Sequence, residues 1–391
     1  MAMWAGEDAC LKCTLCMSAC PVMSVNADFP GPKALGPEWH RRRQEKDVLP
    51  MEHVEDCTFC QLCEAACPVA VPIAHLIAQH KQIRRRTLKI RIRDAVLARP
   101  HWLARTAGLS SLPIPEGARK LIGIASSVTL PQRRREPTEH LGPRLATGRG
   151  AVGVFVDCYS GGYDSELVFR VLALLDLWGY DARPLAGRGC CGAAAYAAGA
   201  PDLACRQGQL TWKSLRDDVA NVDTIIILNA TCDATIRYEW PRYCGIDGNI
   251  PMLSFDEVAW NAPEEFWEHL GSVPLGQGDR YLVHTTCRGK VARGEGYLVQ
   301  LMARAGLSAV PSDADCCGAA GAYAFKAEHQ ATAHDLGYYL RGEADKVGAA
   351  GVVTDSGTCA LHIEQLTQVV TRHPAHWLYE RYRQYLREAI G

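Results

Sequence analysis

The sequence predicts an α+β protein of several domains: a small helical N-terminal domain rich in cysteine, then two copies of an α/β domain. Three observations support this prediction. Eight of the 18 cysteines fall within the first 67 of the 391 residues. From Ala151 onward, short apolar runs alternate with helix-like stretches, which is typical of βαβ units around a parallel sheet. The pattern then recurs about 127 residues later, and so long a period indicates a duplicated domain rather than a solenoid.

The N-terminal cysteines form two runs with the same spacing, C-x2-C-x2-C-x3-C-P, within a predicted domain of residues 1–78. Bacterial ferredoxins hold [4Fe–4S] clusters with this spacing, and in two-cluster ferredoxins the fourth cysteine of each run ligates the other cluster. We therefore expect two clusters. The first ferredoxin site would comprise Cys10, Cys13, Cys16 and Cys67, and the second Cys57, Cys60, Cys63 and Cys20.

Zinc knuckles and disulfides are the alternatives for these cysteines. Zinc takes four ligands in a tetrahedron, whereas C-x2-C-x2-C crowds three thiolates into one turn. Disulfide scaffolds are usually short and secreted, but this chain is long and begins with no recognisable secretion signal. The spacing thus favours metal ligation in a reducing cytoplasm.

Residues 79–149 contain no cysteine and carry a basic segment, KQIRRRTLKIRIRDAVLARP. We predict a basic amphipathic helical linker here. Its cations are Lys81, Arg84, Arg85, Arg86, Lys89, Arg91 and Arg93, and its apolar residues are Leu88, Ile90, Ile92, Val96, Leu97, Trp102 and Leu103. Such a helix can lie among lipid headgroups, or its basic face can be solvated and packed on a partner subunit, and both options stay open. The net charge of -1 and the lack of base-reading features argue against nucleic acid.

Residues 150–275 and 276–391 are predicted to form the two α/β repeats, each with four cysteines in register. Each repeat places one cysteine after a strand, a Cys-Cys-Gly (CCG) motif after the next, and one cysteine after a third. Because the carboxyl ends of parallel strands converge, these thiols could meet around a metal or cluster. The first CCG site would comprise Cys158, Cys190, Cys191 and Cys232, and the second Cys287, Cys316, Cys317 and Cys359.

The alternative for the CCG cysteines is that they are small buried core residues. Their recurrence in register in both repeats argues against this. Gly192 and Gly318 would let the backbone approach closely. Cys205 and Cys244 have no counterpart in the other repeat and are expected to be structural.

The CCG repeats resemble those of the heterodisulfide-reductase iron–sulfur family, which includes the iron–sulfur subunits of glycolate, lactate and glycerol-3-phosphate oxidising complexes. The N-terminal CLKCTLCMSACPVMSVNADFPGPK and the later CCGAAGAYAFK are most similar to the glycerol-3-phosphate members. One feature departs from the family pattern: the C-x2-C that ends each repeat has Asn229 and Ser356 in place of its first cysteine. Each site could therefore hold an ordinary cubane, hold a modified cluster with an oxygen ligand, or be empty.

The resemblance implies an electron-transfer subunit of anaerobic respiration that contains no catalytic residue of its own. Its partners would be flavin-containing dehydrogenase subunits and a membrane quinone or membrane anchor, on the inner face of the cell membrane. Two [4Fe–4S] clusters are expected, with one or two further clusters in the CCG repeats. The alternatives are a catalytic heterodisulfide-reductase-like subunit and an iron–sulfur subunit of a glycolate or lactate oxidising complex. The sequence contains no G-x-G-x-x-G after a strand, P-loop or H-E-x-x-H motif for a substrate site.

Overall fold

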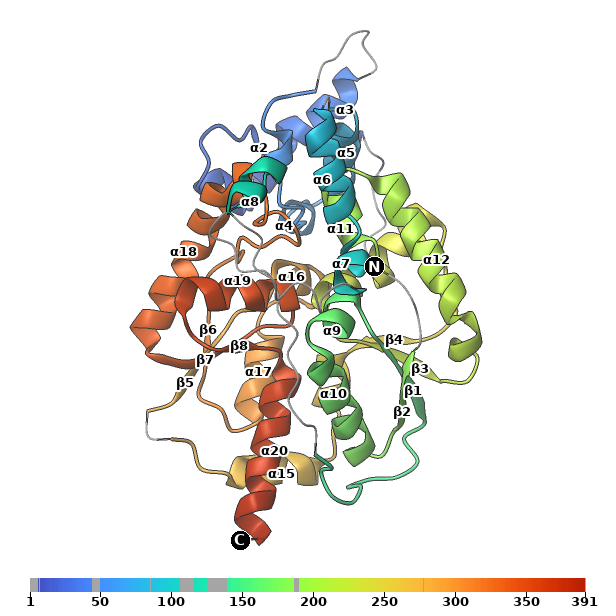
Figure 1. The fold of residues 1–391 in the computed structure, drawn as a ribbon, viewed down its shortest axis with the longest axis vertical. Helices are drawn as coiled ribbons and strands as arrows, with labels where there is room; N and C mark the ends of the chain where they lie inside the picture. The colour runs from blue at the N-terminus through green and yellow to red at the C-terminus, as the bar shows by residue number, and fades with distance from the viewer. Residues whose placement is uncertain are drawn as a thin grey trace.

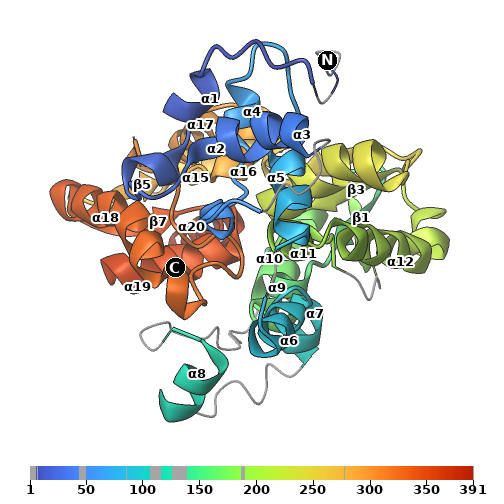
Figure 2. The same cartoon turned by 90° about the horizontal axis from the view of Figure 1, so that it is seen from above.

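The computed structural model describes residues 6, 8–43, 50–84, 86–105, 116–125, 139–185, 190–276 and 278–390. The N-terminal part lies across the top of two α/β units that stand side by side (Figure 1). Seen from above, its short helices cover parts of both units (Figure 2). The predicted α+β class, a helical N-terminal domain followed by duplicated α/β domains, is confirmed.

The N-terminal part consists of short helices joined by tight loops. Its elements are α1 (Leu15–Ser18), η1 (Pro21–Ser24), α2 (Gly31–Lys33), η2 (Ala34–Glu38), α3 (Trp39–Arg42), η3 (Val54–Asp56), α4 (Leu62–Ala65) and α5 (Ile73–Gln82). Equivalent residues of the two cysteine runs adopt left-handed backbone conformations. Lys12 and Phe59 have φ of 59° and 58°, and Thr14 and Gln61 have φ of 69° and 66°. Because this conformation is unfavourable for residues with a Cβ, both runs follow the same specialised loop path.

The linker forms α6 (Leu88–Leu97), α7 (Pro100–Arg105) and α8 (Glu116–Ile122). Residues 83–87 separate α5 from α6, so the basic segment is not one continuous helix. Arg85 lies outside the described residues.

The first repeat contains a parallel four-stranded sheet of order β2-β1-β3-β4. Its elements are β1 (Ala151–Phe155), α9 (Cys158–Gly162), α10 (Ser165–Leu177), β2 (Asp181–Leu185), α11 (Ala193–Ala197), α12 (Pro201–Val219), β3 (Thr224–Ile227), α13 (Ala230–Ala234), η4 (Thr235–Cys244), β4 (Met252–Ser254), α14 (Phe255–Trp260) and α15 (Glu264–Ser272).

The second repeat has the same topology, β6-β5-β7-β8, again all parallel. Its elements are β5 (Arg280–Val283), α16 (Cys287–Arg293), α17 (Tyr297–Arg304), β6 (Ala309–Pro311), η5 (Ala327–His329), α18 (Gln330–Val347), β7 (Ala349–Val353), α19 (Gly357–Thr367), β8 (Thr371–Arg372) and α20 (Pro374–Ile390).

The two repeats share one hydrophobic core. Val154 of β1 and Val283 of β5 belong to the same buried cluster, and Trp178 and Tyr379 extend it. The C-terminal helix α20 packs against α10 and α15 of the first repeat. Shared apolar burial therefore fixes the position of one CCG repeat relative to the other. Within the described part of the chain, no helix combines the length and apolar character needed to cross a bilayer.

Candidate iron–sulfur centres

The cysteines of the first ferredoxin site gather around Cys16. This thiol interacts electrostatically with Cys10, Cys13 and Cys67, although Cys67 belongs to the second run. Two backbone amides face the sulfurs: Lys12 N lies 3.4 Å from Cys10 Sγ, and Val71 N lies 3.4 Å from Cys67 Sγ. Amides directed at sulfur suit a thiolate-bound iron–sulfur cluster, because they stabilise its negative charge.

The second ferredoxin site shows the reciprocal exchange of cysteines. Cys20 of the first run interacts with Cys57 and Cys60, and Cys63 interacts with all three. These four thiols line a single cavity, which Phe59 and Val22 complete on its apolar side. A cavity lined by four thiols fits a [4Fe–4S] cluster, which would supply one-electron transfer there. The ligand assignment itself stays a prediction.

Burial raises the pKa of Cys16 to about 11 and the pKa of Cys20 and Cys60 to about 12. Without metal, these thiols therefore keep their protons at neutral pH. Because thiolate ligation must release those protons, cluster loading of the apoprotein should become more favourable as the pH rises.

In the first repeat, the four CCG cysteines form a continuous series of thiol contacts. Cys158 contacts Cys190, Cys190 contacts Cys191, and Cys191 contacts Cys232. A contact with the neighbouring thiol, together with burial, raises the pKa of Cys190 and Cys191 well above the usual range. The structure therefore brings Cys158 of α9 and Cys232 of α13 beside the CCG pair, as the repeat pattern predicts.

The second repeat reproduces this arrangement. Cys287 contacts Cys316, Cys316 contacts Cys317, and Cys317 contacts Cys359. In both repeats the glycine amide of the motif faces the first cysteine, with Gly192 N and Gly318 N each 3.4 Å from the sulfurs of Cys190 and Cys316.

The CCG glycines are required by their surroundings. Gly192 and Gly318 have φ of +96° and +84°, and an added Cβ would lie 2.6 Å from Ala204 O and 2.0 Å from Ala333 O.

We expect Gly318→Ala to lower the free energy of unfolding by about 2–4 kcal/mol, measured by chemical denaturation. Gly342→Ala is the control, because a Cβ there meets nothing within 4 Å and the helix α18 should gain up to about 1 kcal/mol. Equal effects of the two variants would refute the close-approach explanation.

The residues that replace the missing cysteines stand at helix starts, and the side chain of Asn229 caps its helix. Asn229 Oδ1 accepts a hydrogen bond from Thr231 N at 3.0 Å at the start of α13, and Ser356 stands at the same place before α19. Both residues line one cavity between the repeats, with Asp355 and Arg372. The capping role of Asn229 favours a set of four thiols at the first CCG site.

The second CCG site lies beside the second ferredoxin site. Cys60 interacts electrostatically with both Cys287 and Cys316, and α4 contacts α16. Cys316 also packs in the hydrophobic cluster that contains Cys16 and Cys63. Two candidate cluster sites that are far apart in sequence are thus adjacent in space.

A buried polar junction holds the three parts of the protein together at this point. Glu239 Oε1 accepts hydrogen bonds from Arg288 Nη2 at 2.6 Å and from Gln61 Nε2 at 2.8 Å. Arg288 also donates to Thr235 Oγ1 at 3.1 Å, and its guanidinium lies 5.7 Å from the Phe59 ring centre. Sequence reasoning missed this junction.

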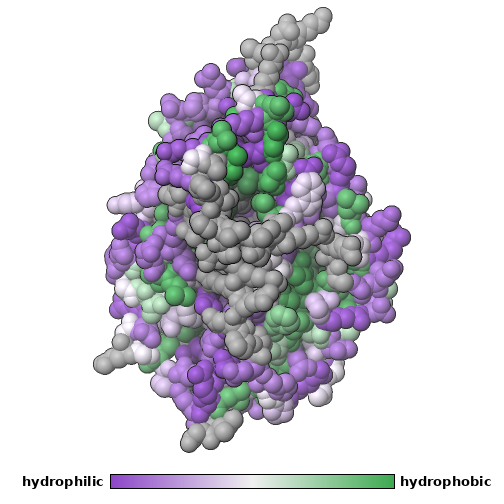
Figure 3. All heavy atoms as spheres, in the orientation of Figure 1, coloured by the Kyte–Doolittle hydropathy of each residue, from purple (hydrophilic) through white to green (hydrophobic). Residues whose placement is uncertain are grey.

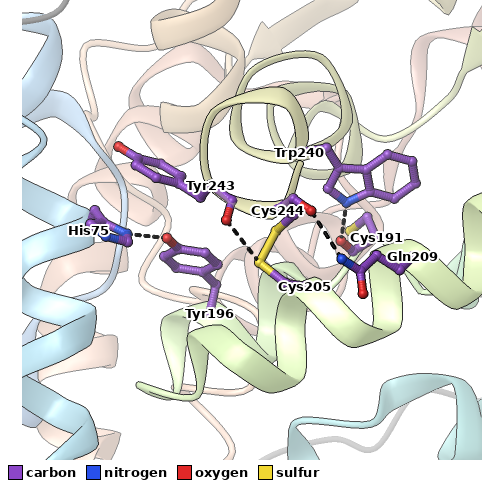
Figure 4. Close-up of a disulfide and its surroundings, with 8 residues drawn as sticks. All are labelled: His75, Cys191, Tyr196, Cys205, Gln209, Trp240, Tyr243 and Cys244. Atoms are coloured by element: carbon purple, nitrogen blue, oxygen red, sulfur yellow. Dashed lines mark hydrogen bonds between the residues drawn. A yellow bond between two sulfur atoms is a disulfide. The ribbon is translucent and has the colours of Figure 1, made fainter. Parts of the chain in front are cut away.

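Cys205 and Cys244, which were expected to be structural, are bonded to each other as a disulfide (Figure 4). The bond joins α12 to the end of η4, and both cysteines pack beside Cys191 and Cys232. In the same region, Trp240 Nε1 donates to Cys191 O at 2.8 Å (Figure 4). The bond has a structural role, because it fixes the end of the π-helix η4 to α12.

Family models match three segments of the chain. A 4Fe–4S dicluster domain covers residues 7–71, and a cysteine-rich domain, CCG, covers residues 152–237 and again 281–364. The chain therefore contains one 4Fe–4S dicluster domain and two CCG domains. The three matched segments contain all sixteen predicted ligand cysteines.

The chain is similar to one component of the anaerobic glycerol-3-phosphate dehydrogenase of Escherichia coli K12. The two sequences are 29% identical over 93% of this chain and 96% of the relative. The same component in Escherichia coli O157:H7 gives the same values. One component of the fumarate reductase (CoM/CoB) of Methanothermobacter marburgensis is 22% identical over 91% of this chain and 67% of its own length. The relatives and the domains support an iron–sulfur electron-transfer subunit of an oxidoreductase.

Proposed function

We propose that this chain carries electrons from the flavin of a dehydrogenase that oxidises glycerol 3-phosphate, through clusters in its ferredoxin and CCG sites, to a membrane quinone. The observation that supports this most directly is the electrostatic interaction of the Cys60 thiol with those of Cys287 and Cys316. It makes the second ferredoxin site and the second CCG site neighbours, as consecutive steps of an electron path require. The similarity to a component of the anaerobic glycerol-3-phosphate dehydrogenase supports the choice of substrate for the partner.

The test uses the native complex, purified without oxygen through a tag on this chain. Iron analysis should give about sixteen irons per chain if both CCG sites hold cubanes, and about eight if only the ferredoxin sites are loaded. Glycerol 3-phosphate should reduce the clusters, and a quinone analogue should reoxidise them. Reduction by lactate or glycolate alone would assign the chain to another dehydrogenase. Substrate turnover by this chain without its partners would refute a purely electron-carrying role.

We further propose that the chain docks on an anionic membrane surface through α6 and α8. Residues Leu88, Ile92 and Leu121 are 70%, 59% and 71% exposed, and Val96 and Ile122 extend the same surface. Figure 3 shows hydrophobic surface, in green, over α6 and α8 on one face of the molecule. Exposed cations stand among them, namely Lys89, Arg91 and Lys120. Apolar side chains interspersed with cations suit the headgroup region of anionic lipid.

The helix α6 buries Arg93 and Asp94 on its inner face and exposes Leu88 and Ile92 on its outer face. Arg93 donates to Glu328 Oε2 at 2.7 Å and pairs with Asp94 at 3.0 Å, and Lys326 lies 3.2 Å from Asp94. Because these ion pairs fix the inner face, Leu88 and Ile92 are held outward. Arg86 has a structural role as well, since it pairs with Glu55 and donates to Ala198 O at 3.1 Å.

We expect the triple variant Leu88→Ser, Ile92→Ser and Val96→Ser to bind vesicles of anionic phospholipid at least tenfold more weakly in a flotation assay. Each apolar side chain that enters the interface contributes on the order of 1 kcal/mol or more. Added salt should weaken the binding of the native complex, because the cations contribute. Leu210→Ser is the matched control, since Leu210 is 69% exposed on α12, outside this surface. Undiminished flotation of the triple variant would exclude this face as the docking surface.

A further inference from the structure

The two CCG repeats differ at one buried position beside their cysteines. Phe155 stands three residues before Cys158, and His284 stands three residues before Cys287. Phe155 ends β1, and His284 directly follows β5, where its backbone N–H donates to Val353 O at 2.9 Å. The equivalent strands of the repeats therefore present an aromatic hydrocarbon in one case and an imidazole in the other.

Strand alternation determines which face of the sheet His284 occupies. Leu282 packs in the cluster that contains Cys317 and Cys359, whereas the next residue, Val283, packs in the core shared by both repeats. Because successive side chains alternate between faces, His284 belongs to the face of the thiols.

The first repeat provides an independent check of this placement. There, Val154 packs in the shared core, and Phe155 packs in the cluster with Cys191 and Cys232. Phe155, which occupies in the first repeat the position of His284 in the second, thus lies in the same buried cluster as two CCG cysteines.

The imidazole of His284 is fully buried and lacks a partner. Its residue is 1% exposed, and neither Nδ1 nor Nε2 has a hydrogen-bond partner among the described residues. The charged groups around it are Lys290, Asp355 and Asp315, the last directly before Cys316. Burial lowers the pKa of His284 to about 4, so the ring is neutral and has one N–H to donate. A buried donor without an acceptor is unusual in a folded protein and points to a missing group.

We propose that His284 donates a hydrogen bond to a sulfur of an iron–sulfur cluster in the second CCG site and raises its reduction potential above that of the first CCG site. The four thiols complete the ligand set of a cubane, which leaves the imidazole as a donor rather than a ligand. Reduction adds negative charge to the cluster, and an N–H directed at sulfur stabilises that charge. The inference rests on the proposed function, because it requires a loaded second CCG site.

Reciprocal exchange of the two residues tests the proposal in the native complex. EPR-monitored redox titration of His284→Phe should lower one midpoint potential, with a shift of about tenfold in its reduction equilibrium, or about 59 mV for one electron. The other midpoints should stay unchanged. Phe155→His should raise a different midpoint. His284→Gln keeps an N–H donor and should retain a midpoint closer to the native value than His284→Phe does.

Each result has a defined meaning, including failure of a variant to fold. If Phe155→His does not fold, the comparison of His284→Phe with His284→Gln decides alone. Unchanged midpoints in a fully loaded His284→Phe complex would overturn the donor role and leave the electron-transfer function intact. Loss of about four irons in the same variant would also overturn it, because His284 would then be a ligand. A native complex with only about eight irons would instead refute the loading of the CCG sites.

Discussion

Replacing Cys20 with alanine should abolish the cluster of the second cysteine run and leave the cluster of the first run in place. The reason is that Cys20 lies with Cys57, Cys60 and Cys63, although it is distant from them in sequence. By the same logic, Cys67→Ala should remove the cluster held by Cys10, Cys13 and Cys16. Each variant should lose about four irons per chain.

Reference variants identify which cluster has been lost. Cys13→Ala and Cys60→Ala each remove a cysteine whose site is not in question, and their EPR spectra define the two ferredoxin signals. The Cys20→Ala spectrum should match that of Cys60→Ala, and the Cys67→Ala spectrum should match that of Cys13→Ala. If Cys20→Ala instead matches Cys13→Ala, each run ligates its own cluster. Joint replacement of Cys205 and Cys244 with serine is the control and should leave the iron content unchanged.

The sequence predicted what local spacing can encode. Two cysteine runs of identical spacing and an in-register duplication were sufficient to predict the helical domain and the paired parallel sheets. They also indicated which cysteines could lie close together. Thr14 and Gln61 occupy equivalent positions and both adopt left-handed backbone conformations, so equal spacing in the two runs gives the same local loop path. Hydrophobic periodicity likewise located the strands after which the CCG cysteines stand.

The sequence could not predict contacts between distant segments. Gln61 and Glu239 are separated by 178 residues, and no local pattern indicates that they meet at Arg288. The sequence also could not predict the orientation of α6, because its buried face carries two charges, Arg93 and Asp94, that pair with Glu328 and Lys326 of the distant second repeat. His284 did leave a signal, since the aligned repeats place it opposite Phe155, but its lack of a partner is evident only in the fold.

A second buried arginine, Arg293, links carboxylates of the two repeats. Arg293 of the second repeat contacts Asp233 at 2.5 Å and Asp256 at 3.0 Å in the first repeat, and Asp355 at 3.0 Å in its own. Its side chain is 8% exposed, and its pKa is raised because the neighbouring Tyr297 and carboxylates outweigh burial. Tyr297 donates a hydrogen bond to Asp355 from the same cluster.

We expect Arg293→Met to lower the free energy of unfolding by about 3–5 kcal/mol, because it leaves buried carboxylates without their cation. The loss should depend on pH. Burial raises the pKa of Asp256 to about 7, above the value of about 3.9 in an unfolded chain. The folded state therefore binds this proton more tightly, so its contribution to stability is greatest in acid and is lost as the pH rises through 7. Without Arg293 the carboxyls should hold protons still more tightly, and the deficit of the variant should shrink between pH 8 and pH 6.

Chemical denaturation of the wild type and the variant at both pH values measures this deficit. Arg144→Met is the matched control, because Arg144 pairs with Asp176 on the surface, where both side chains are about two-fifths exposed. That variant should lose no more than about 1 kcal/mol and show little change between the two pH values. A deficit for Arg293→Met as small as that of the control, or one that grows toward pH 6, would mean that the aspartates do not depend on this arginine. The Arg293 cluster would then contribute little to the interface between the CCG repeats.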